Sequence, residues 1–211
     1  MHKPVFLLLL TLTFGSAGAQ YSGYTLLANT SAFKEQFAEA SQKMTSMSCN
    51  FVQEKNLSML SEKISSKGRF WYKRDNRIRM EYQDPFEYLM ILNNDKVYIK
   101  DGQNENTIST RSNQLFRQIN SVMIDCVKGT ALSSQDFSIR LFENGQFYLV
   151  ELSPSAKSMK AFFKNINIIV DKKDYSASAI EMFELSGDNT LIHFLNKKLN
   201  TPIADELFTI H

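Results

Sequence analysis

Residues 68–99 constrain the fold of this chain more than any other stretch of its sequence. They contain four runs rich in aromatic and β-branched residues, separated by Asp-Asn, Gln-Asp-Pro and Asn-Asn-Asp, which are typical of tight turns. Every second side chain of a strand shares a face. The apolar residues that share a face by this rule in the first two runs are Phe70, Tyr72, Ile78, Met80 and Tyr82. The stretch therefore predicts an antiparallel meander with one apolar, aromatic face and one charged face, and the apolar face must be covered.

The rest of the chain is also rich in strand-like runs. Those outside residues 68–99 are residues 47–55, 59–64, 137–142, 146–152, 164–170, 179–185, 190–195 and 204–210. About ten strands in order, without alternation of strands and helices, predict a single antiparallel sheet in a mainly β (α+β) domain. A sheet of this length curls. It forms either a small barrel with a filled interior or, if it stays open, a cavity suited to an apolar ligand.

Two segments have the period of a helix instead of the alternation of a strand. In residues 31–44, apolar residues recur at three- and four-residue spacing, which predicts an N-terminal amphipathic helix that packs on the sheet. Thr30 or Ser31 is expected to cap its start. Residues 115–126 place apolar side chains on one side of a second helix, which ends near Gly129. This second helix is a candidate to lie across the apolar face of the sheet.

Residues 1–19 have the pattern of a secretory signal peptide. Lys3 gives a short positive region, residues 5–12 are apolar, and residues 17–19 are small. The apolar run is too short to span a bilayer, and no cysteine follows it as a site of lipid attachment. We therefore expect cleavage after residue 19, export to the periplasm and a single soluble domain over residues 20–211. Retention of the segment as an anchor is the alternative.

The composition argues against a nucleic-acid partner. Of the 211 residues, 43% are hydrophobic and 22% are charged, which is ordinary for one globular domain. The formal net charge is only +2 and no block of like charge occurs, whereas phosphate binding needs a concentrated basic patch. We expect a monomer that does not bind nucleic acid.

Cys49 and Cys126 are the only two cysteines of the sequence. An even count in an exported chain permits one disulfide between them, and two buried free thiols are the alternative. Neither cysteine lies in a Cys-x-x-Cys motif or beside a histidine, so we do not expect a catalytic thiol.

The sequence contains no constellation that is typical of an enzyme. Its histidines are His2, His193 and His211, which are too scattered to indicate a metal site or a catalytic triad. The motifs of nucleophilic hydrolases, zinc proteases, phosphate loops and dinucleotide-binding turns do not occur in it. We therefore predict that the protein is not an enzyme and uses no metal or other cofactor.

A series of short motifs occurs in one order along the chain. They are Phe51-x-Gln53, Gly68-x-Phe70-Trp71-Tyr72-Lys73-Arg74, Arg79-x-Glu81-Tyr82, Asn93-Asn94-Asp95, Leu149-x-x-Leu152-x-Pro154 and Gly187-Asp188-x-Thr190. In these motifs and their order the sequence resembles the periplasmic outer-membrane lipoprotein carrier family (LolA-like), over nearly the whole mature chain. The resemblance implies an unclosed antiparallel β half-barrel with an N-terminal helix and a helical lid over its concave apolar face.

The resemblance also implies a function and its partners. Members of the family accept an acylated lipoprotein from an inner-membrane transporter, hold its acyl chains in the half-barrel and pass it to an outer-membrane acceptor. Residues 115–126 are then expected to form the lid. The residues expected to line the acyl-chain cavity are Phe70, Tyr72, Ile78, Met80, Tyr82, Leu89, Ile91, Phe116, Ile119 and Met123. Packing of these side chains in a filled core is the alternative.

By the same resemblance, Arg74 is expected to tether the lid. The family arginine with this role lies in a Lys-Arg-Pro segment, which here is Lys73-Arg74-Asp75, with an aspartate in place of the proline. Arg74 shares the parity of Phe70 and Tyr72, and an arginine on the inner face needs acceptors such as the carbonyls at a helix end. The alternative is an exposed arginine at the end of the strand.

Three functions remain to be distinguished. The first is a periplasmic carrier (chaperone) of lipoproteins, or of another lipid that suits the same fold. The second is a periplasmic sensor of lipids or lipoproteins, which usually needs a second domain or a membrane partner. The third is a lipid esterase, which the missing nucleophile constellation disfavours. Because the mature chain has room for one domain only, we favour the carrier.

Overall fold

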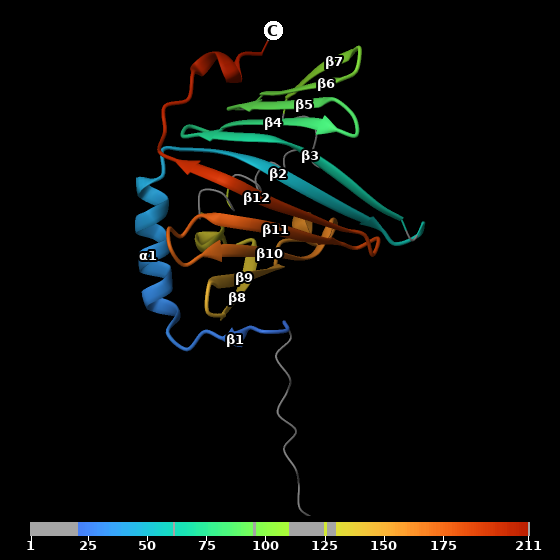
Figure 1. Ribbon diagram of the computed structural model, residues 1–211. Helices are drawn as coiled ribbons and strands as arrows, with labels where there is room; N and C mark the ends of the chain where they lie inside the picture. Colours follow the sequence, from blue (N-terminus) through green and yellow to red (C-terminus); the bar gives the residue numbers. More distant parts are fainter. Residues whose placement is uncertain (1–20, 61, 95, 110–124, 126–129, 211) are drawn as a thin grey trace, which may run out of the picture.

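The computed structural model describes residues 21–60, 62–94, 96–109, 125 and 130–210 (Figure 1). Its strands are β1 Thr25–Leu26, β2 Ser46–Leu57, β3 Glu62–Lys73, β4 Arg77–Asp84, β5 Tyr88–Asn93, β6 Lys96–Asp101, β7 Asn104–Ser109, β8 Phe137–Glu143, β9 Phe147–Pro154, β10 Phe163–Asp171, β11 Ala177–Glu184 and β12 Asn189–Leu199. Its α-helices are α1 Thr30–Lys43 and α3 Lys157–Lys160, and its 3₁₀ helices are η1 Thr130–Ser133 and η2 Asp205–Phe208. The predicted signal peptide and nearly all of the predicted lid helix lie outside the described residues.

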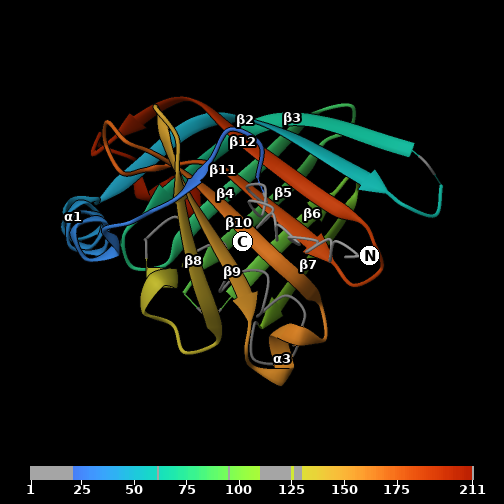
Figure 2. The same ribbon diagram turned by 90° about the horizontal axis from the view of Figure 1, so that it is seen from below.

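The strands form one antiparallel sheet of 12 strands in the order β1-β8-β9-β10-β11-β12-β2-β3-β4-β5-β6-β7. Two meanders, β2–β7 and β8–β12, are joined where β12 pairs with β2, with Phe194 opposite Phe51. The edge strands β1 and β7 do not pair with each other, so the curved sheet is an open half-barrel (Figures 1 and 2). This topology confirms the predicted mainly β fold with an unclosed antiparallel sheet.

The N-terminal helix α1 lies across one end of the half-barrel, beside the ends of the strands (Figure 1). Asn29 caps it, just before the two residues predicted for this role, because its side-chain oxygen accepts a hydrogen bond from the Ala32 N–H at 3.2 Å. Phe33 and Phe37 of α1 are buried in the core. The ring of Phe33 packs against Tyr148 of β9 with centroids 4.6 Å apart. The helix therefore packs its apolar stripe on the sheet, as its periodicity predicted.

The C-terminal residues 200–210, which we call the C-terminal strap, pack on the outer face of β3–β6. The buried members of this outer cluster are Trp71, Ile91, Tyr98, Ile203 and Phe208. Polar contacts fix the strap in register: Asn93 Nδ2 donates to the Phe208 carbonyl at 3.1 Å, and Arg79 donates to the Leu207 carbonyl at 3.2 Å. Both faces of β5 are therefore covered by protein, one by the core and the other by the strap.

Asp205 links the C-terminal strap to β3 and β4. Its carboxylate lies 2.5 Å from Lys73 Nζ and 2.6 Å from Arg77 Nη1. The hydrogen bond from Lys73, together with the attraction of Lys73 and Arg77, lowers the pKa of Asp205. A carboxylate whose pKa is lowered by folding stabilises the fold above its ordinary pKa, near 4, and this contribution is lost as the pH falls through the lowered value.

We therefore expect the stability difference between the wild type and Asp205→Asn to depend on pH. The wild type should be the more stable above about pH 5, and the difference should shrink below about pH 4, where protonation removes the same charge. Urea unfolding of both proteins across this range measures the difference. A difference that stays constant down to the lowest pH would contradict the role of the Asp205 charge.

Candidate functional site: the concave apolar face

The concave side of the half-barrel carries one buried apolar cluster built from both meanders. Its buried side chains include Met47, Phe51, Phe70, Tyr72, Ile78, Met80, Leu92, Val150, Leu152, Ile166, Ile168, Ile180, Met182, Ile192 and Phe194. The rings of Phe70 and Phe194, one from each meander, lie 5.2 Å apart. Aromatic, methionine and branched aliphatic side chains thus cover the inner surface across the junction of the two meanders.

Five of the predicted cavity residues share this face. Phe70 and Tyr72 of β3 lie opposite Met80 and Ile78 of β4, and all four are buried in the core cluster. Tyr82 is half-buried and packs against the same cluster. The alternation read from the sequence is confirmed for these two strands. Contact of these side chains with an acyl chain stays a prediction.

Leu89 and Ile91 were predicted for the cavity, and the structure places them on the wrong face for that role. Both belong to the outer cluster under the C-terminal strap. The residues of β5 that face the core are Tyr88, Met90 and Leu92, which pair with the inward residues of β4. The error has a physical cause. Because both faces of β5 are covered, the run Leu89–Leu92 is apolar throughout and shows no alternation.

The other predicted cavity residues, Phe116, Ile119 and Met123, lie outside the described residues, so their place over the concave face stays a prediction. Cys126, the expected disulfide partner of Cys49, also lies outside the described residues. Cys49 itself is a free, buried thiol in the structure, and burial raises its pKa to about 12. A thiol with this pKa is protonated and unreactive at neutral pH.

Arg74 lies in the turn after β3 and is exposed, as in the alternative expected for it. Its guanidinium does bind carbonyls at a helix end, but the helix is α1. The Nη2 group donates to the carbonyl of Gln42 in the last turn of α1, and to that of Met44 at 3.0 Å. The Arg74 N–H also donates to the Thr45 carbonyl at 2.8 Å. Arg74 therefore holds the C-terminal end of α1 against β3, and a tether to the predicted lid stays a prediction.

Removal of this side chain by Arg74→Ala should lower the free energy of unfolding by about 1 kcal/mol, because a cation and two hydrogen bonds at the helix C-terminus are lost. Arg74→Lys should recover part of the loss, since it keeps the charge but not the planar fork of the guanidinium. Urea unfolding followed by circular dichroism measures both changes. Equal stability of the wild type and the alanine variant would contradict the role given to Arg74.

A cavity of about 310 Å³, which we call the mouth, opens at the end of the concave face opposite α1. It is lined by Gln53, Lys55, Phe162, Phe163, Met182, Glu184 and Thr190. Met182 and Phe163 are buried, whereas the half-buried Lys55 and Glu184 form an ion pair at 3.6 Å. An apolar interior with a few polar groups at its border suits a molecule with an acyl chain and a polar end.

The mouth residues were not among the predicted site residues. Gln53 occurs in the Phe51-x-Gln53 motif, which was the one signal that could have indicated it. Tyr82 connects the predicted residues to the mouth, because its hydroxyl donates to Gln53 Oε1 at 2.9 Å and its ring packs against Phe51 at 4.9 Å. Burial raises the pKa of Tyr82, so the hydroxyl keeps its proton and can donate at neutral pH.

Lys197 is a charged residue beside the apolar core that the alternation did not predict. A register shift in β12 around Asn196, which has φ +56°, turns the Lys197 side chain toward β11, where it is 12% exposed. Its Nζ donates to Ser176 Oγ at 2.6 Å and to Ser178 Oγ at 2.9 Å. Ser176 also lines a cavity of about 250 Å³ between α1 and the ends of the strands. No pattern in the sequence indicates this site, because alternation alone cannot reveal a bulge.

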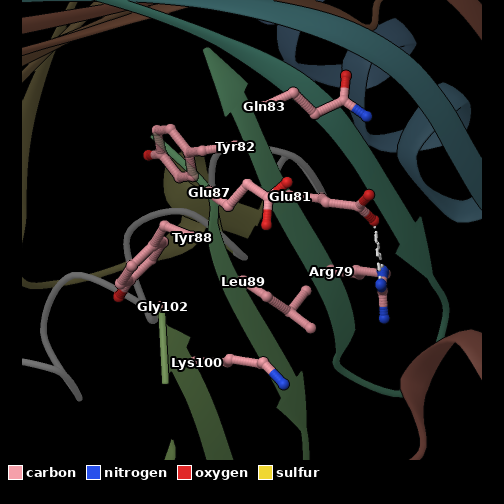
Figure 3. Close-up of a pocket in the computed structure, with 9 residues that line it drawn as sticks. All are labelled: Arg79, Glu81, Tyr82, Gln83, Glu87, Tyr88, Leu89, Lys100 and Gly102. Atoms are coloured by element: carbon pink, nitrogen blue, oxygen red, sulfur yellow. Dashed lines mark hydrogen bonds and ion pairs between the residues drawn. The ribbon is translucent and has the colours of Figure 1, made fainter. Parts of the chain in front are cut away.

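A further cavity, of about 430 Å³, is formed by β4, β5, β6 and their turns (Figure 3). Its lining residues are Arg79, Glu81, Tyr82, Gln83, Glu87, Tyr88, Leu89, Lys100 and Gly102. Figure 3 shows Leu89 between the ion pair of Arg79 with Glu81 and the side chain of Lys100. This charged lining does not suit an acyl chain, so we assign the acyl-chain site to the concave face and its mouth.

Within the residues that the structure describes, no group of histidine, cysteine, aspartate or glutamate side chains is arranged to hold a metal ion. Among the same residues, no helix has the length and apolar character needed to cross a bilayer. The chemical character of the described site is therefore that of the apolar concave surface, the mouth and the few polar side chains beside them.

The open antiparallel sheet with an apolar cluster on its concave side defines the class of half-barrel proteins. Within that class, the model of the family described as Outer membrane lipoprotein carrier protein LolA matches residues 42–211, and the chain belongs to this family. Members of this family bind lipids or lipoproteins. A search of curated proteins by sequence gave no significant match.

Solved structures share the fold at low sequence identity. MucB superposes with a TM-score of 0.52 and 14% identity, over 88% of this chain and 64% of that chain. The complex of MucA and MucB from Pseudomonas aeruginosa gives a TM-score of 0.50 and 12% identity, over 85% of this chain and 60% of that chain. An uncharacterized conserved protein from Thermus thermophilus gives a TM-score of 0.53 and 8% identity, over 87% of this chain and 95% of that chain. At these identities the similarity is one of fold.

Proposed function

We propose that this protein is a periplasmic carrier (chaperone) that binds the acyl chains of lipoproteins and shuttles them from the inner to the outer membrane. The observation that carries the proposal is the apolar cluster on the concave side together with the mouth at its end. Membership of the LolA family supports it. Its partners are then an inner-membrane transporter that supplies the cargo and an outer-membrane acceptor that receives it.

A carrier must also release the chains that it binds. Each methylene moved from water to the concave face contributes about 0.8 kcal/mol, so several acyl chains would bind almost irreversibly without a competing term. A lid that occupies the same surface in the absence of cargo offsets much of this gain, and we assign that role to residues 115–126. Met80 and Met182 suit a flexible ligand, because the unbranched methionine side chain adapts to different shapes.

Binding without catalysis agrees with the residues around the concave face. The polar groups at the acyl-chain site include the Gln53 amide, the Thr190 hydroxyl, the protonated hydroxyl of Tyr82 and the Lys55–Glu184 ion pair. These groups can orient a polar end by hydrogen bonds, but they do not form the pair of nucleophile and general base that acyl transfer requires. We therefore assign them to recognition of the cargo.

A sensor of lipids or lipoproteins is the second candidate. The fold similarity to MucB, whose structure in complex with MucA is known, is the observation that favours it. A sensor passes the binding event on to a protein partner, whereas a carrier passes on the bound molecule. Copurification of a stoichiometric protein partner that dissociates when lipid is added would favour the sensor.

Mass spectrometry of organic extracts tests the carrier most simply. The protein is purified from the periplasm of its own host without detergent, and the extract and a tryptic digest are analysed. We expect acyl chains in the extract and peptides of acylated lipoproteins in the digest. Extracts that hold only free lipids would indicate the carrier of another lipid. Protein without extractable lipid and without affinity for a fatty acid would contradict both.

A further inference from the structure

The exposed large apolar side chains are concentrated at one end of the half-barrel. Of the seven such residues among the described ones, five lie on or beside the turns opposite α1: Met59, Leu60, Ile64, Phe86 and Leu185. Met59 is 92% exposed, and Leu60 and Leu185 are 61% exposed each. Figures 1 and 2 both show the β2–β3 hairpin and the β11–β12 turn at this end. Single exposed apolar residues need no explanation, but such a group indicates an interaction site.

Met59, Leu60 and Leu185, which we call the apolar rim, project from turns that brace each other. The Ser58 N–H donates to Asp188 Oδ1 at 2.9 Å, which ties the β2–β3 hairpin to the β11–β12 turn. The Leu185 N–H donates to the Phe162 carbonyl at 3.2 Å, which ties the same turn to the second residue after α3. The two turns are therefore held together, and the side chains that they carry are exposed.

The apolar rim borders the mouth. Phe162, whose carbonyl accepts from Leu185, lines the mouth, and so does Glu184, the residue before Leu185. Lys55, two residues before the end of β2, lines it from the other hairpin. Whatever surface the rim contacts therefore lies next to the entrance of the concave face.

The charges around the apolar rim favour a lipid surface as its partner. Three ion pairs balance most of them: Lys55 with Glu184 at 3.6 Å, Lys63 with Glu54 at 2.7 Å and Lys67 with Asp84 at 3.7 Å. Two further carboxylates, Glu62 and Asp188, lie beside the rim, and α3, which ends two residues before Phe162, carries the exposed side chains of Lys157 and Lys160. Balanced charge suits phospholipid headgroups, which carry both signs, and the α3 lysines lie where they can meet phosphates. Exposed apolar side chains on turns can enter between headgroups, and here they lie beside the entrance of an apolar site.

We propose that the apolar rim inserts into the surface of a phospholipid bilayer and thereby positions the mouth at the membrane surface. The inference rests on the proposed function, because it holds the mouth at the membrane surface where the cargo is received and released. Docking is reversible, since three apolar side chains give only weak anchoring compared with a spanning helix.

Cosedimentation with protein-free vesicles tests the proposal. The vesicles contain phosphatidylcholine alone, or phosphatidylcholine with added phosphatidylglycerol. The purified wild type should sediment with both, and more strongly with the anionic vesicles because of Lys157 and Lys160. The double variant Met59→Glu/Leu60→Glu should partition at least about tenfold less, because two carboxylates replace the inserted side chains. Both positions are exposed, so the fold should be kept, which circular dichroism checks.

Leu195→Glu is the matched control, because Leu195 is also an exposed apolar residue, at 45%, but lies on β12 away from the apolar rim. It should sediment like the wild type. Absence of wild-type binding to both vesicles, or an equal loss for Leu195→Glu, would overturn the proposal. Retention only on membranes that contain protein would overturn it too and would indicate a protein partner. Binding of a soluble fluorescent fatty acid separates this outcome from the proposed function, because the double variant should still bind that probe like the wild type.

Discussion

Replacement of Gly68 by alanine is expected to lower the free energy of unfolding by about 4 kcal/mol or more, a large part of the stability of an ordinary domain. Gly68 lies in β3 opposite Tyr82, next to a register shift. A Cβ atom at Gly68 would lie 2.1 Å from the carbonyl oxygen of Glu81 and 2.7 Å from the ring of Phe51. Neither group can move away easily, because the Glu81 carbonyl is backbone of β4 and the Phe51 side chain is buried, at 1% exposure. The methyl group must therefore push β3 away from β4 or displace a core ring.

Gly145→Ala is the control for this substitution. Gly145 lies between β8 and β9, and a Cβ atom there would have nothing within 4 Å. Urea unfolding followed by circular dichroism should show a large loss for Gly68→Ala and a change of less than about 0.5 kcal/mol for Gly145→Ala. Similar unfolding midpoints for the two variants would show that the close approach at Gly68 does not hold in solution.

Introduction of a charge at the mouth, by Phe162→Asp, is expected to weaken the binding of a fluorescent fatty acid by about tenfold or more. Phe162 is half-buried and lines the mouth with Met182 and Phe163. An acyl chain that enters there would replace the water around the introduced carboxylate, and this desolvation costs more than the roughly 1.4 kcal/mol that corresponds to a factor of ten. The effect should appear in the dissociation constant, measured by fluorescence titration.

The variant Leu195→Asp controls for the general effect of an added carboxylate, because Leu195 is exposed and does not line the mouth. It should bind the fatty acid like the wild type. Thermal unfolding should show that Phe162→Asp remains folded, since its side chain is only partly buried. Wild-type affinity in the folded Phe162→Asp protein would exclude the mouth as the entrance to the site.

The sequence was sufficient to predict the sheet and one wall of the candidate site. In β4 the apolar residues alternate with charged ones, and in β3 Phe70 and Tyr72 flank Trp71, so the inward set of Phe70, Tyr72, Ile78 and Met80 could be recognised by parity. Alternation is informative there because one face carries the core and the other carries arginines such as Arg79. In β5 both faces are buried, the alternation disappears, and Leu89 and Ile91 were assigned to the wrong side.

The features that the sequence did not reveal depend on tertiary contacts. The C-terminal strap has no periodicity of its own, and its place is set by Asp205 and by Phe208 against β3–β6. Arg74 was expected on the inner face, but it is exposed, and only the folded chain shows that its acceptors are carbonyls at the end of α1. The mouth combines β2 with residues of the second meander more than a hundred positions away, which no local pattern can bring together.

Photo-crosslinking with a fatty acid that carries a diazirine on its chain tests the central claim most directly. Neighbouring residues of β5 face opposite sides, so this strand allows the two faces to be compared within one peptide. Met90 and Leu92 face the core, whereas Leu89 and Ile91 face the strap. After irradiation, peptide mass spectrometry should locate the adducts on Met90, Leu92 and other concave residues such as Met182. Adducts confined to Leu89, Ile91 and the charged residues Arg79, Glu81 and Lys100 of the cavity in Figure 3 would contradict an acyl-chain site on the concave face.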